Sequence, residues 1–503
     1  MKQLQCATLE GIEALPVTVE STLTRGLPSF TIVGLASSAI SEARERVKSA
    51  LLANDFTFPP KRITINLSPS DVEKRGSQFD LGIALLIALD GSDTDFEKWY
   101  AFGELGLDGS IKENTILYPL VLSLANQGLL THAVVPEEAM DKLTNIPDVT
   151  FVGAGNLSEA IGFFRSDMNL SAAQPQKKTI DFPVQEIGGQ RYYYRKHYPD
   201  DFIEIRGQEV AKRAALISAC GMHNLLLEGS PGCGKSMIAK RLRYILPPMT
   251  DRELLDIAKL DTLEGKTPHF APLRPYRSPH HSSTAASIFG GGSYKAQIGE
   301  VGLAHNGILF FDELPHFSKP VLEALREPLE DKRIRISRVH SKVEYPTDFL
   351  FVAAMNPCPC GNLLSDELEC RCSDLEIRRY KGRLSDPFLD RIDLYVQMQS
   401  VRADDKASVS SETMHETVLR VHALQRRRSQ NALNGRLTDR EIDTICRLDT
   451  EADTILSQAV QRFGLSFRSI KKVQKVARTI ADIERSETIR KHHLLEALSY
   501  RRR

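Results

Sequence analysis

The stretch LLLEGSPGCGKSMIAK, residues 225–240, decides the fold. A short apolar strand runs into Gly229, and Gly234-Lys235-Ser236 then opens a helical pattern, so a phosphate loop has its required strand–loop–helix context. Lys235 is expected to reach the β- and γ-oxygens of ATP and Ser236 to bind Mg²⁺, while glycines turn backbone N–H groups inward. The predicted nucleotide-binding residues are Gly229, Ser230, Pro231, Gly232, Cys233, Gly234, Lys235, Ser236 and Met237.

A second apolar strand, residues 308–311, ends in the carboxylates of Asp312 and Glu313. We predict that Asp312 holds Mg²⁺ together with Ser236, and that Glu313 orients or deprotonates the attacking water. Alone, such a run is more typical of a strand entering a capped turn. Its position after a phosphate loop favours the catalytic interpretation, and Glu313 favours hydrolysis.

A third apolar strand, residues 349–355, ends at Asn356. Its place in the series predicts that Asn356 positions the lytic water. A turn-forming Asn before Pro357 is the alternative interpretation, since Asn is a common turn residue.

Two arginines are candidates for stabilising charge on a transferred phosphoryl group. Arg391 lies between Asp390 and Asp393, at the point in the chain where ring ATPases carry an arginine finger. A solvated ion pair is its alternative interpretation. Arg468 precedes a predicted helix over residues 469–484 and is expected to reach the same phosphates, unless it is an exposed arginine at a helix start.

Four of the eight cysteines lie close together as two C-x-C pairs, at Cys358, Cys360, Cys370 and Cys372. Eight are too few for a disulfide scaffold in a chain of 503 residues. Four thiolates on one loop predict a tetrahedral Zn²⁺ site, although the spacing is tighter than usual and free structural cysteines remain the alternative.

Length and composition predict about three domains in an ordinary soluble protein. Apolar and polar periodicity divides the chain into an α/β or α+β domain (1–165), a polar linker (166–200), an α/β core (201–400) and an all-α lid (401–503). No apolar run is long enough to span a membrane and the N-terminus does not resemble a signal peptide, so a cytoplasmic location is expected.

Charge is balanced, with 65 basic and 65 acidic residues, so contact with nucleic acid requires local basic patches. Two segments qualify: residues 288–295, a glycine-rich loop ending in Tyr294-Lys295, and residues 331–342, whose alternation predicts a basic β-hairpin with Ile334, Ile336 and Val339 inward. Solvated loops are the alternative. The predicted DNA contacts are Lys295, Arg335, Arg338 and Lys342, whereas 426–428 and 501–503 are interpreted as a helix face and a tail.

Five segments resemble the YifB/ComM family of magnesium-chelatase-like AAA+ ATPases, and the resemblance covers nearly the whole chain. They are PLRPYRSPHHS (272–282), IGEVGLAHNGILFFDELPHF (298–317), VLEALREPLED (321–331), AAMNPCPCG (353–361) and LDRID (389–393). The ComM type implies a hexameric helicase that drives branch migration of DNA junctions in recombination and natural transformation. The implied partners are single-stranded, duplex and branched DNA, further copies of the chain and a recombinase. Two local departures, Asp386 in Ser-Asp-Pro and Phe467 before Arg468, concern the lid.

The first domain resembles the Lon-type protease domain, with a ribosomal-S5-domain-2-like α+β fold, in residues 74–89 and 102–120. Gln78 stands where Lon proteases have the catalytic Ser and Tyr118 where they have the Lys, so we expect no proteolysis and an assembly or DNA-binding role. For the whole chain the resemblance implies an ATP-driven DNA helicase. The alternative is a chelatase-type or protein-remodelling motor.

Overall fold

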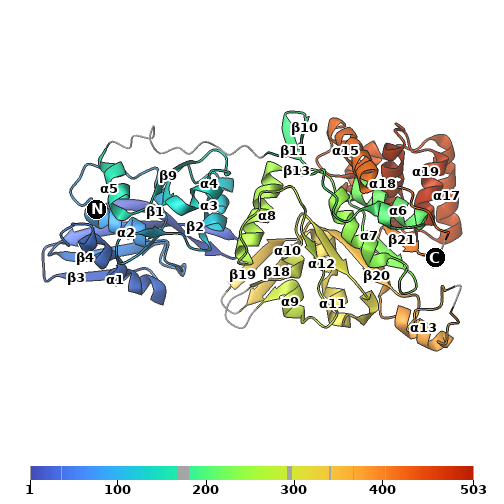
Figure 1. Ribbon diagram of the computed structural model, residues 1–503, viewed down its shortest axis with the longest axis horizontal. Coiled ribbons are helices and arrows are strands. Elements are labelled where there is room, and N and C mark those ends of the chain that lie inside the picture. The colour runs from blue at the N-terminus through green and yellow to red at the C-terminus, as the bar shows by residue number, and fades with distance from the viewer. Residues whose placement is uncertain are drawn as a thin grey trace. The chain divides into compact units, whose positions relative to one another are not determined.

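A computed structural model describes residues 2–35, 37–166, 181–291, 297–338, 341–365, 368–402 and 404–501 (Figure 1). The chain forms two compact units. The first comprises Met1–Asp181 with Ala258–Phe270, and the second Phe182–Ile257 with Ala271–Arg503.

The first unit is built on a seven-stranded mixed sheet with the order β3-β4-β2-β1-β5-β8-β9. Antiparallel pairing joins β1 to β2 and β2 to β4, whereas the other neighbours are parallel. The strands are β1 (Lys2–Glu10), β2 (Glu13–Thr24), β3 (Ser29–Val33), β4 (Arg62–Ser68), β5 (Trp99–Ala101), β8 (His132–Pro136) and β9 (Thr150–Ala154), with a separate pair β6 (Glu104–Leu105) and β7 (Ile111–Lys112).

Helices α1 (Ser38–Ala53), α2 (Asp80–Ala88), α3 (Leu117–Asn126), α4 (Met140–Leu143) and α5 (Leu157–Arg165) complete the first unit. The apolar run at 81–89 forms most of α2, which contacts α1, α5, β1 and β2 and is buried on all sides. An all-round apolar helix of this length is a core helix. Its one acid, Asp80, pairs with Arg46 at 2.6 Å.

Gln78 and Tyr118, at which the resemblance to Lon-type proteases predicts neither nucleophile nor base, both lie in the core. The Gln78 amide donates to the carbonyls of Ala7 (3.0 Å) and Arg75 (2.8 Å), and both Gln78 and Tyr118 are buried. Neither side chain has the chemistry of an activated hydroxyl and its amine base. The absence of proteolysis stays a prediction.

A five-stranded parallel sheet with the order β14-β17-β20-β12-β21 organises the second unit. Its strands are β14 (Tyr276–Arg277), β17 (Ile308–Phe311), β20 (Leu350–Met355), β12 (Leu225–Glu228) and β21 (Leu394–Gln397). Helix α6 (Glu209–Gly221) contacts β12 and β21, and α7 (Lys235–Leu242) contacts β20. The central strands are buried throughout and, apart from Glu228 at the end of β12, apolar, as expected for a parallel sheet covered on both faces.

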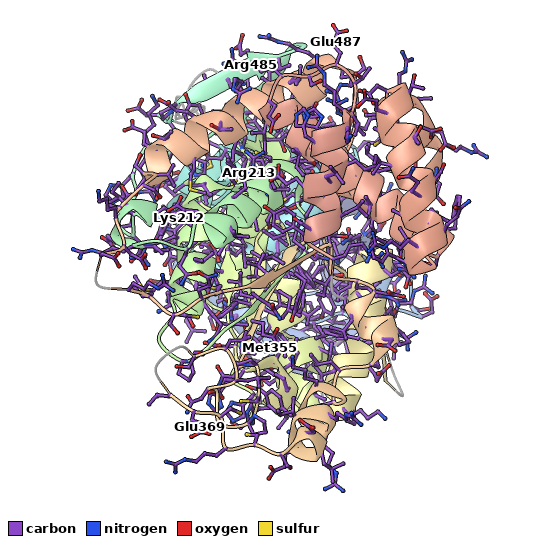
Figure 2. All side chains as sticks on the ribbon, turned by 90° about the vertical axis from the view of Figure 1, so that its right-hand side faces the viewer. Lys212, Arg213, Met355, Glu369, Arg485 and Glu487 are labelled. Carbon is purple, nitrogen blue, oxygen red and sulfur yellow. The ribbon has the colours of Figure 1, made fainter. Side chains whose placement is uncertain are left out.

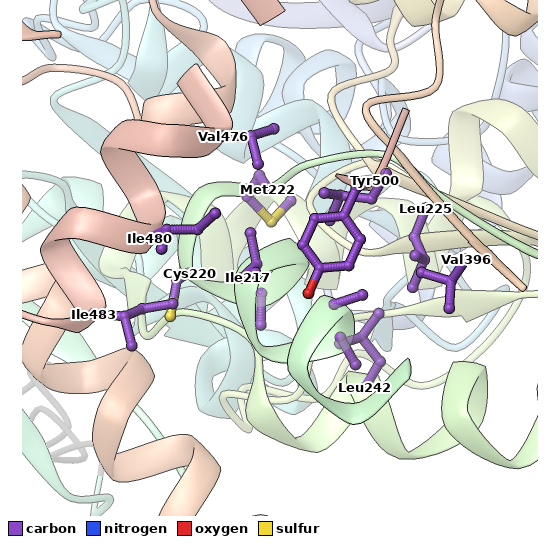
Figure 3. Close-up of a cluster of buried hydrophobic side chains, with 14 of the residues drawn as sticks. Ile217, Cys220, Met222, Leu225, Leu242, Val396, Val476, Ile480, Ile483 and Tyr500 are labelled. Atoms are coloured by element: carbon purple, nitrogen blue, oxygen red, sulfur yellow. The ribbon is translucent and has the colours of Figure 1, made fainter. Parts of the chain in front are cut away.

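The C-terminal region is helical, as the sequence predicts. It contains α15 (Ser411–Arg427), α16 (Asp439–Ile445), α17 (Thr450–Phe463), α18 (Phe467–Ile483) and α19 (Lys491–Ser499). Figure 3 shows Ile217 and Cys220 of α6 in one cluster with Ile480 of α18 and Val396 of β21. The parallel sheet and the lid helices therefore share one hydrophobic core.

The predicted linker, residues 166–200, differs from the structure in its second half. Strands β10 (Val184–Ile187) and β11 (Gln190–Tyr193) form an antiparallel hairpin, and β11 also pairs with β13 (Met249–Thr250). Tyr192 and Tyr193 are buried, and Tyr192 packs with Ile187 and Ala423. The local composition of this segment could not predict the hairpin, because its aromatic rings are buried by residues far away in the sequence. Residues 167–180 lie outside the described residues.

Shorter elements connect these parts: α8 (Asp251–Leu263), α9 (Ala285–Phe289), β15 (Gly290–Gly291), β16 (Gln297–Ile298), α10 (Glu300–Leu303), α11 (Lys319–Ala324), α12 (Arg326–Asp331), β18 (Arg333–Arg338), β19 (Ser341–Pro346), α13 (Asp374–Lys381) and α14 (Asp386–Leu389). The second half of α8 belongs to the first unit, which differs from the predicted continuous core over 201–400.

Among the described helices, none combines the length and apolar character needed to cross a lipid bilayer.

Buried neutral histidines make the second unit sensitive to acid. Burial lowers the pKa of His305 and His415 to about 4 and that of His422 to about 3. His305 Nδ1 accepts from the Asp348 N–H (3.1 Å) and His422 Nε2 from Arg426 Nε (3.2 Å), contacts that require the neutral ring. Because an unfolded histidine titrates near pH 6.5, the unfolded chain binds more protons below that pH.

We therefore predict that the free energy of unfolding of this unit falls as the pH is lowered from about 6.5 towards 4. The slope is up to about 1.4 kcal/mol per pH unit for each histidine. Urea denaturation between pH 7.5 and pH 5 measures it. His415→Gln should flatten the dependence, and an unchanged slope would contradict the assignment.

Candidate functional site

The parallel register of β12, β20 and β17 brings three predicted site segments to one edge of the sheet. Glu228 at the end of β12 pairs with Met355, and Phe311 at the end of β17 pairs with Ala353. The loops that follow these strands therefore leave the sheet together. Ligands of open α/β sheets bind outside the carboxyl ends of the strands, which is where this edge lies.

The phosphate loop has the conformation that its glycines permit. Gly232 and Gly234 have φ values of +81° and +95°, a region that other residues rarely adopt. The Lys235 ammonium lies over the loop and donates to the carbonyls of Gly229 (2.6 Å) and Ser230 (2.9 Å). Both contacts are with the loop's own backbone, so a phosphate group can replace them without moving the helix.

The predicted magnesium ligands meet in the structure. The Ser236 hydroxyl donates to Asp312 Oδ2 at 2.8 Å, so the end of β17 faces the first turn of α7. Hydroxyl and carboxylate oxygens, completed by water and phosphate oxygens, are the donor set that Mg²⁺ prefers. Asn356 Oδ1 accepts from Lys235 Nζ at 3.2 Å, which places the predicted sensor residue beside the amine predicted to bind phosphate.

Glu313 follows in a left-handed conformation with φ of +50°, and its N–H donates to Asp312 Oδ1 at 2.9 Å. A left-handed backbone at a residue other than Gly stores strain of about 1 kcal/mol or more, and such strain is common at functional sites. His281 Nδ1 lies 3.4 Å from Glu313 Oε2. Local sequence does not indicate this contact, because His281 lies 32 residues before Glu313 in the chain.

Tyr380 is a further residue near the site that the sequence did not predict. It is buried, and burial raises its pKa to about 12, so the phenol stays protonated at neutral pH. Its surroundings include the backbone of Asn356 and the carboxylate of Glu313. No sequence motif marks this tyrosine, since α13 approaches the site only through the fold.

Arg391 and Arg468 are held together by a single carboxylate. Arg391 Nη2 donates to Glu330 Oε2, and Arg468 Nη2 lies 3.0 Å from Glu330 Oε1. Burial opposes the charge on Glu330, but the hydrogen bond from Arg391 and the charge of Arg468 outweigh it and lower the pKa of this carboxyl. The two predicted arginines therefore converge, and Glu330 is the residue that the sequence missed.

Arg391 is anchored at the end of the sheet opposite the phosphate loop. The Asn224 side chain, just before β12, donates to the Arg391 carbonyl at 2.8 Å and accepts from the Phe351 N–H at 3.2 Å. The four residues of β12 span about 13 Å. Within the described residues, neither Arg391 nor Arg468 is hydrogen-bonded to the phosphate loop, so the structure does not join them to the nucleotide site of their own chain.

The two local departures from the family pattern, at Asp386 and Phe467, are accommodated. Ser385 caps α14, with Asp386 in the first turn, where a carboxylate interacts favourably with the helix dipole. Phe467 is 67% exposed, and Lys471 Nζ lies 5.2 Å from the centre of its ring. Neither residue disturbs the helix that carries Arg468.

The four clustered cysteines converge. Their sulfur atoms all lie within 4.8 Å of one another, with Cys358–Cys360 at 3.4 Å and Cys358–Cys370 at 3.6 Å. Tetrahedral Zn²⁺ with Zn–S bonds of 2.3 Å sets its ligands about 3.8 Å apart. The cluster, which Cys372 completes, is thus compatible with zinc.

The cysteine loop packs against the phosphate loop. The Gly361 N–H donates to the Cys358 carbonyl at 3.0 Å and closes a tight turn. Gly361 has a φ of +84°, and a Cβ atom there would lie 2.6 Å from Pro231 Cδ. Glycine is therefore required for this close approach, which links the cysteine cluster to the nucleotide site.

The predicted basic hairpin is present as β18 and β19, with Ile334 and Ile336 buried. Arg335 is exposed, but its Nε donates to Glu344 at 2.7 Å, and Arg333 lies 3.5 Å from the same carboxylate. Part of the predicted positive charge is thus neutralised. Lys295 and Val339, together with the side chains of Arg338 and Lys342, lie outside the described residues.

Comparisons with known proteins cover most of the chain. Residues 201–406 match the family described as "Magnesium chelatase, subunit ChlI", residues 19–139 "Subunit ChlI of Mg-chelatase" and residues 408–501 "Magnesium chelatase, subunit ChlI C-terminal". The competence protein ComM of Haemophilus influenzae is 37% identical over 501 residues, which cover 98% of this chain and 95% of the relative. The uncharacterized protein YifB of Escherichia coli is 37% identical over 503 residues, with the same coverage.

Replacing Gly361 by alanine tests the contact between the two loops. We predict that Gly361→Ala weakens ATP binding and lowers the free energy of unfolding by about 1 kcal/mol more than a control glycine replacement does, because Pro231 must move. Gly464→Ala is the control, since Gly464 has a φ of +60° and open space around its Cβ position. Urea denaturation and titration with a fluorescent ATP analogue measure both effects; equal behaviour of the two variants would contradict the contact.

Proposed function

The chain belongs to the YifB/ComM family of magnesium-chelatase-like AAA+ proteins, and from this premise we propose that it is an ATP-driven DNA helicase that promotes branch migration of recombination intermediates. The observation that carries the proposal is the near-complete alignment with a relative named for competence, the uptake of DNA. The contacts of Lys235 with Asn356 and of Ser236 with Asp312 support ATP hydrolysis. The proposed setting is the cytoplasm, with a recombinase as a further partner.

Within one chain, the nucleotide site performs the steps that need close contact with ATP. Lys235 binds the β- and γ-phosphates, and Ser236 and Asp312 hold Mg²⁺. Glu313 accepts a proton from the attacking water, which Asn356 orients. Their contacts at the edge of the sheet keep these groups in place before ATP arrives, so little reorganisation is needed during hydrolysis.

Arg391 and Arg468 act on the ATP of a neighbouring chain. Arg391 is anchored at the opposite end of β12 from the phosphate loop, and Arg468 shares Glu330 with it. A planar guanidinium stabilises charge on the transferred phosphoryl group. Each site is complete only in an oligomer, and a hexameric ring repeats this contact around a closed circle.

Movement between these sites drives the DNA. The hairpin β18–β19 and the loop that contains Lys295 face the pore of the ring, with Arg335, Arg338, Lys342 and Lys295 as contacts for the phosphate backbone. Alternation of Ile334 and Ile336 with arginines on β18 supports this placement, because the apolar side fixes the hairpin and leaves cations outward. The Lon-like domain serves as an assembly or DNA-binding scaffold.

A chelatase-type or protein-remodelling motor is the second candidate. It is favoured by a 25% identical segment of 257 residues in the magnesium-chelatase 67 kDa subunit of Heliobacterium mobile, which covers 40% of this chain. In that case the pore grips a protein. DNA would then leave ATP turnover unchanged.

Turnover in the presence of synthetic four-way junctions separates the two candidates. We predict that junction DNA stimulates ATP hydrolysis and that the protein converts the junction into its two duplex products. Glu313→Gln should keep ATP binding but lower turnover by about 10²-fold or more, because the water loses its base. Unstimulated hydrolysis and an intact junction would rule out the helicase.

Metal analysis tests the proposed zinc site. We predict about one Zn²⁺ per chain, lost in Cys358→Ser because three thiolates and a hydroxyl bind zinc more weakly. Cys446→Ser is the matched control, since Cys446 is a buried cysteine outside the cluster. A zinc-free wild-type protein, purified without chelators, would show that these cysteines are structural thiols.

A further inference from the structure

A groove of about 890 Å³ runs along α15 in the second unit, remote in sequence from the hairpin β18–β19. Its walls also come from the strand β10, the segment after β11 and the loop after α18, which Figure 2 marks with Arg485 and Glu487. Tyr194, Leu424 and Ala423 supply an aromatic and apolar part of the lining. Six cationic side chains line the groove against the two acids Glu416 and Glu487: Lys196, Arg420, Arg427, Arg428, Arg447 and Arg485.

Within the part of the chain that the structure describes, most of these cations form no ion pair with a carboxylate. Arg428 is neutralised by the buried Asp482. Arg420 instead donates to the Ile483 carbonyl at 3.0 Å, and Arg447 donates to the Thr444 carbonyl at 3.1 Å. A carbonyl satisfies a hydrogen bond but leaves the cation uncompensated, so the groove holds an excess of positive charge.

Arg485 has a backbone conformation that favours glycine. It follows Glu484, the C-cap residue of α18, and has a left-handed φ of +61°, where glycine is strongly preferred. Its positive charge also opposes that of Arg420. Two unfavourable local features at one exposed arginine are expected where the side chain serves a ligand rather than the fold.

We propose that this groove binds the phosphate backbone of single-stranded DNA, as a contact additional to the pore loops. The inference rests on the proposed DNA motor and names a second site for its substrate. Cations that track a backbone beside an aromatic ring suit a single strand, whose unstacked bases can lie against Tyr194. A strand separated by the ring is held there after it leaves the pore.

Replacing Arg485 by glycine separates binding from folding. Arg485→Gly removes the strain and the cation together, so we expect a melting temperature higher by about 2 °C and a weaker affinity for a fluorescent 30-nucleotide oligo(dT). The slope of log affinity against log salt should fall by about 0.7, the value for one lost contact with a single strand. Ser429→Gly is the matched control, because Ser429 follows α15 with the same φ of +61° and carries no charge; it should bind as the wild type does.

Charge reversal in the groove gives an independent measurement. Arg427→Glu should weaken oligo(dT) binding about tenfold or more, whereas Arg440→Glu, at an exposed position of α16 outside the groove lining, should change it little. If Arg485→Gly and Arg427→Glu both bound oligo(dT) with wild-type affinity, the proposal of a DNA site in the groove would be wrong. The proposed DNA motor would survive that result if Arg335→Ala in the hairpin still weakened binding. No binding of DNA by the wild type would overturn the motor and the groove together, and equal loss for duplex and oligo(dT) would overturn the assignment to a single strand.

Discussion

The parallel alignment of β12, β17 and β20 is the constraint on which the nucleotide site depends. Because these strands are buried throughout and almost entirely apolar, their register leaves little freedom to the loops that follow them. Ser236 and Asp312 follow β12 and β17, the strands on either side of β20, and their side chains meet; Asn356, which follows β20, reaches Lys235. The opposite end of the same sheet anchors Arg391 through Asn224. One sheet thus separates the residues proposed to bind ATP from the arginine proposed to act on a neighbour's ATP.

Two contacts connect this sheet to neighbouring segments. One depends on the side chain of Glu330, and the other on the absence of a side chain at Gly361. Glu330 holds the two arginines as one unit, so a movement of either the core or the lid reaches both guanidinium groups. Gly361 allows the cysteine loop to lie on Pro231. Metal occupancy of the cysteine cluster would therefore act on the nucleotide site through a direct contact. The net charge of the chain is balanced, but positive charge is distributed unevenly. Arg333 and Arg335 of the hairpin share Glu344, whereas the groove along α15 keeps its positive charge.

Residues whose chemistry is local were predicted from the sequence, and residues brought together by packing were not. Lys235, Ser236, Asp312 and Asn356 each follow an apolar strand, so their types and order indicate the site. His281, Tyr380 and Glu330 lack such a signal, because only the folded chain places them beside Glu313 or the arginines. The hairpin at 184–193 was interpreted as linker for the same reason: Tyr192 is buried by Ala423, more than two hundred positions away.

Mixing two inactive variants tests most directly whether neighbouring chains share each nucleotide site. Lys235→Ala removes ATP binding from its own site, and Arg391→Ala removes the arginine supplied to the next. In a mixed oligomer, an Arg391→Ala chain that receives Arg391 from a Lys235→Ala neighbour has a complete site, so the mixture should hydrolyse ATP although neither variant does so alone. A mixture that stays inactive while both variants assemble together would contradict the shared site.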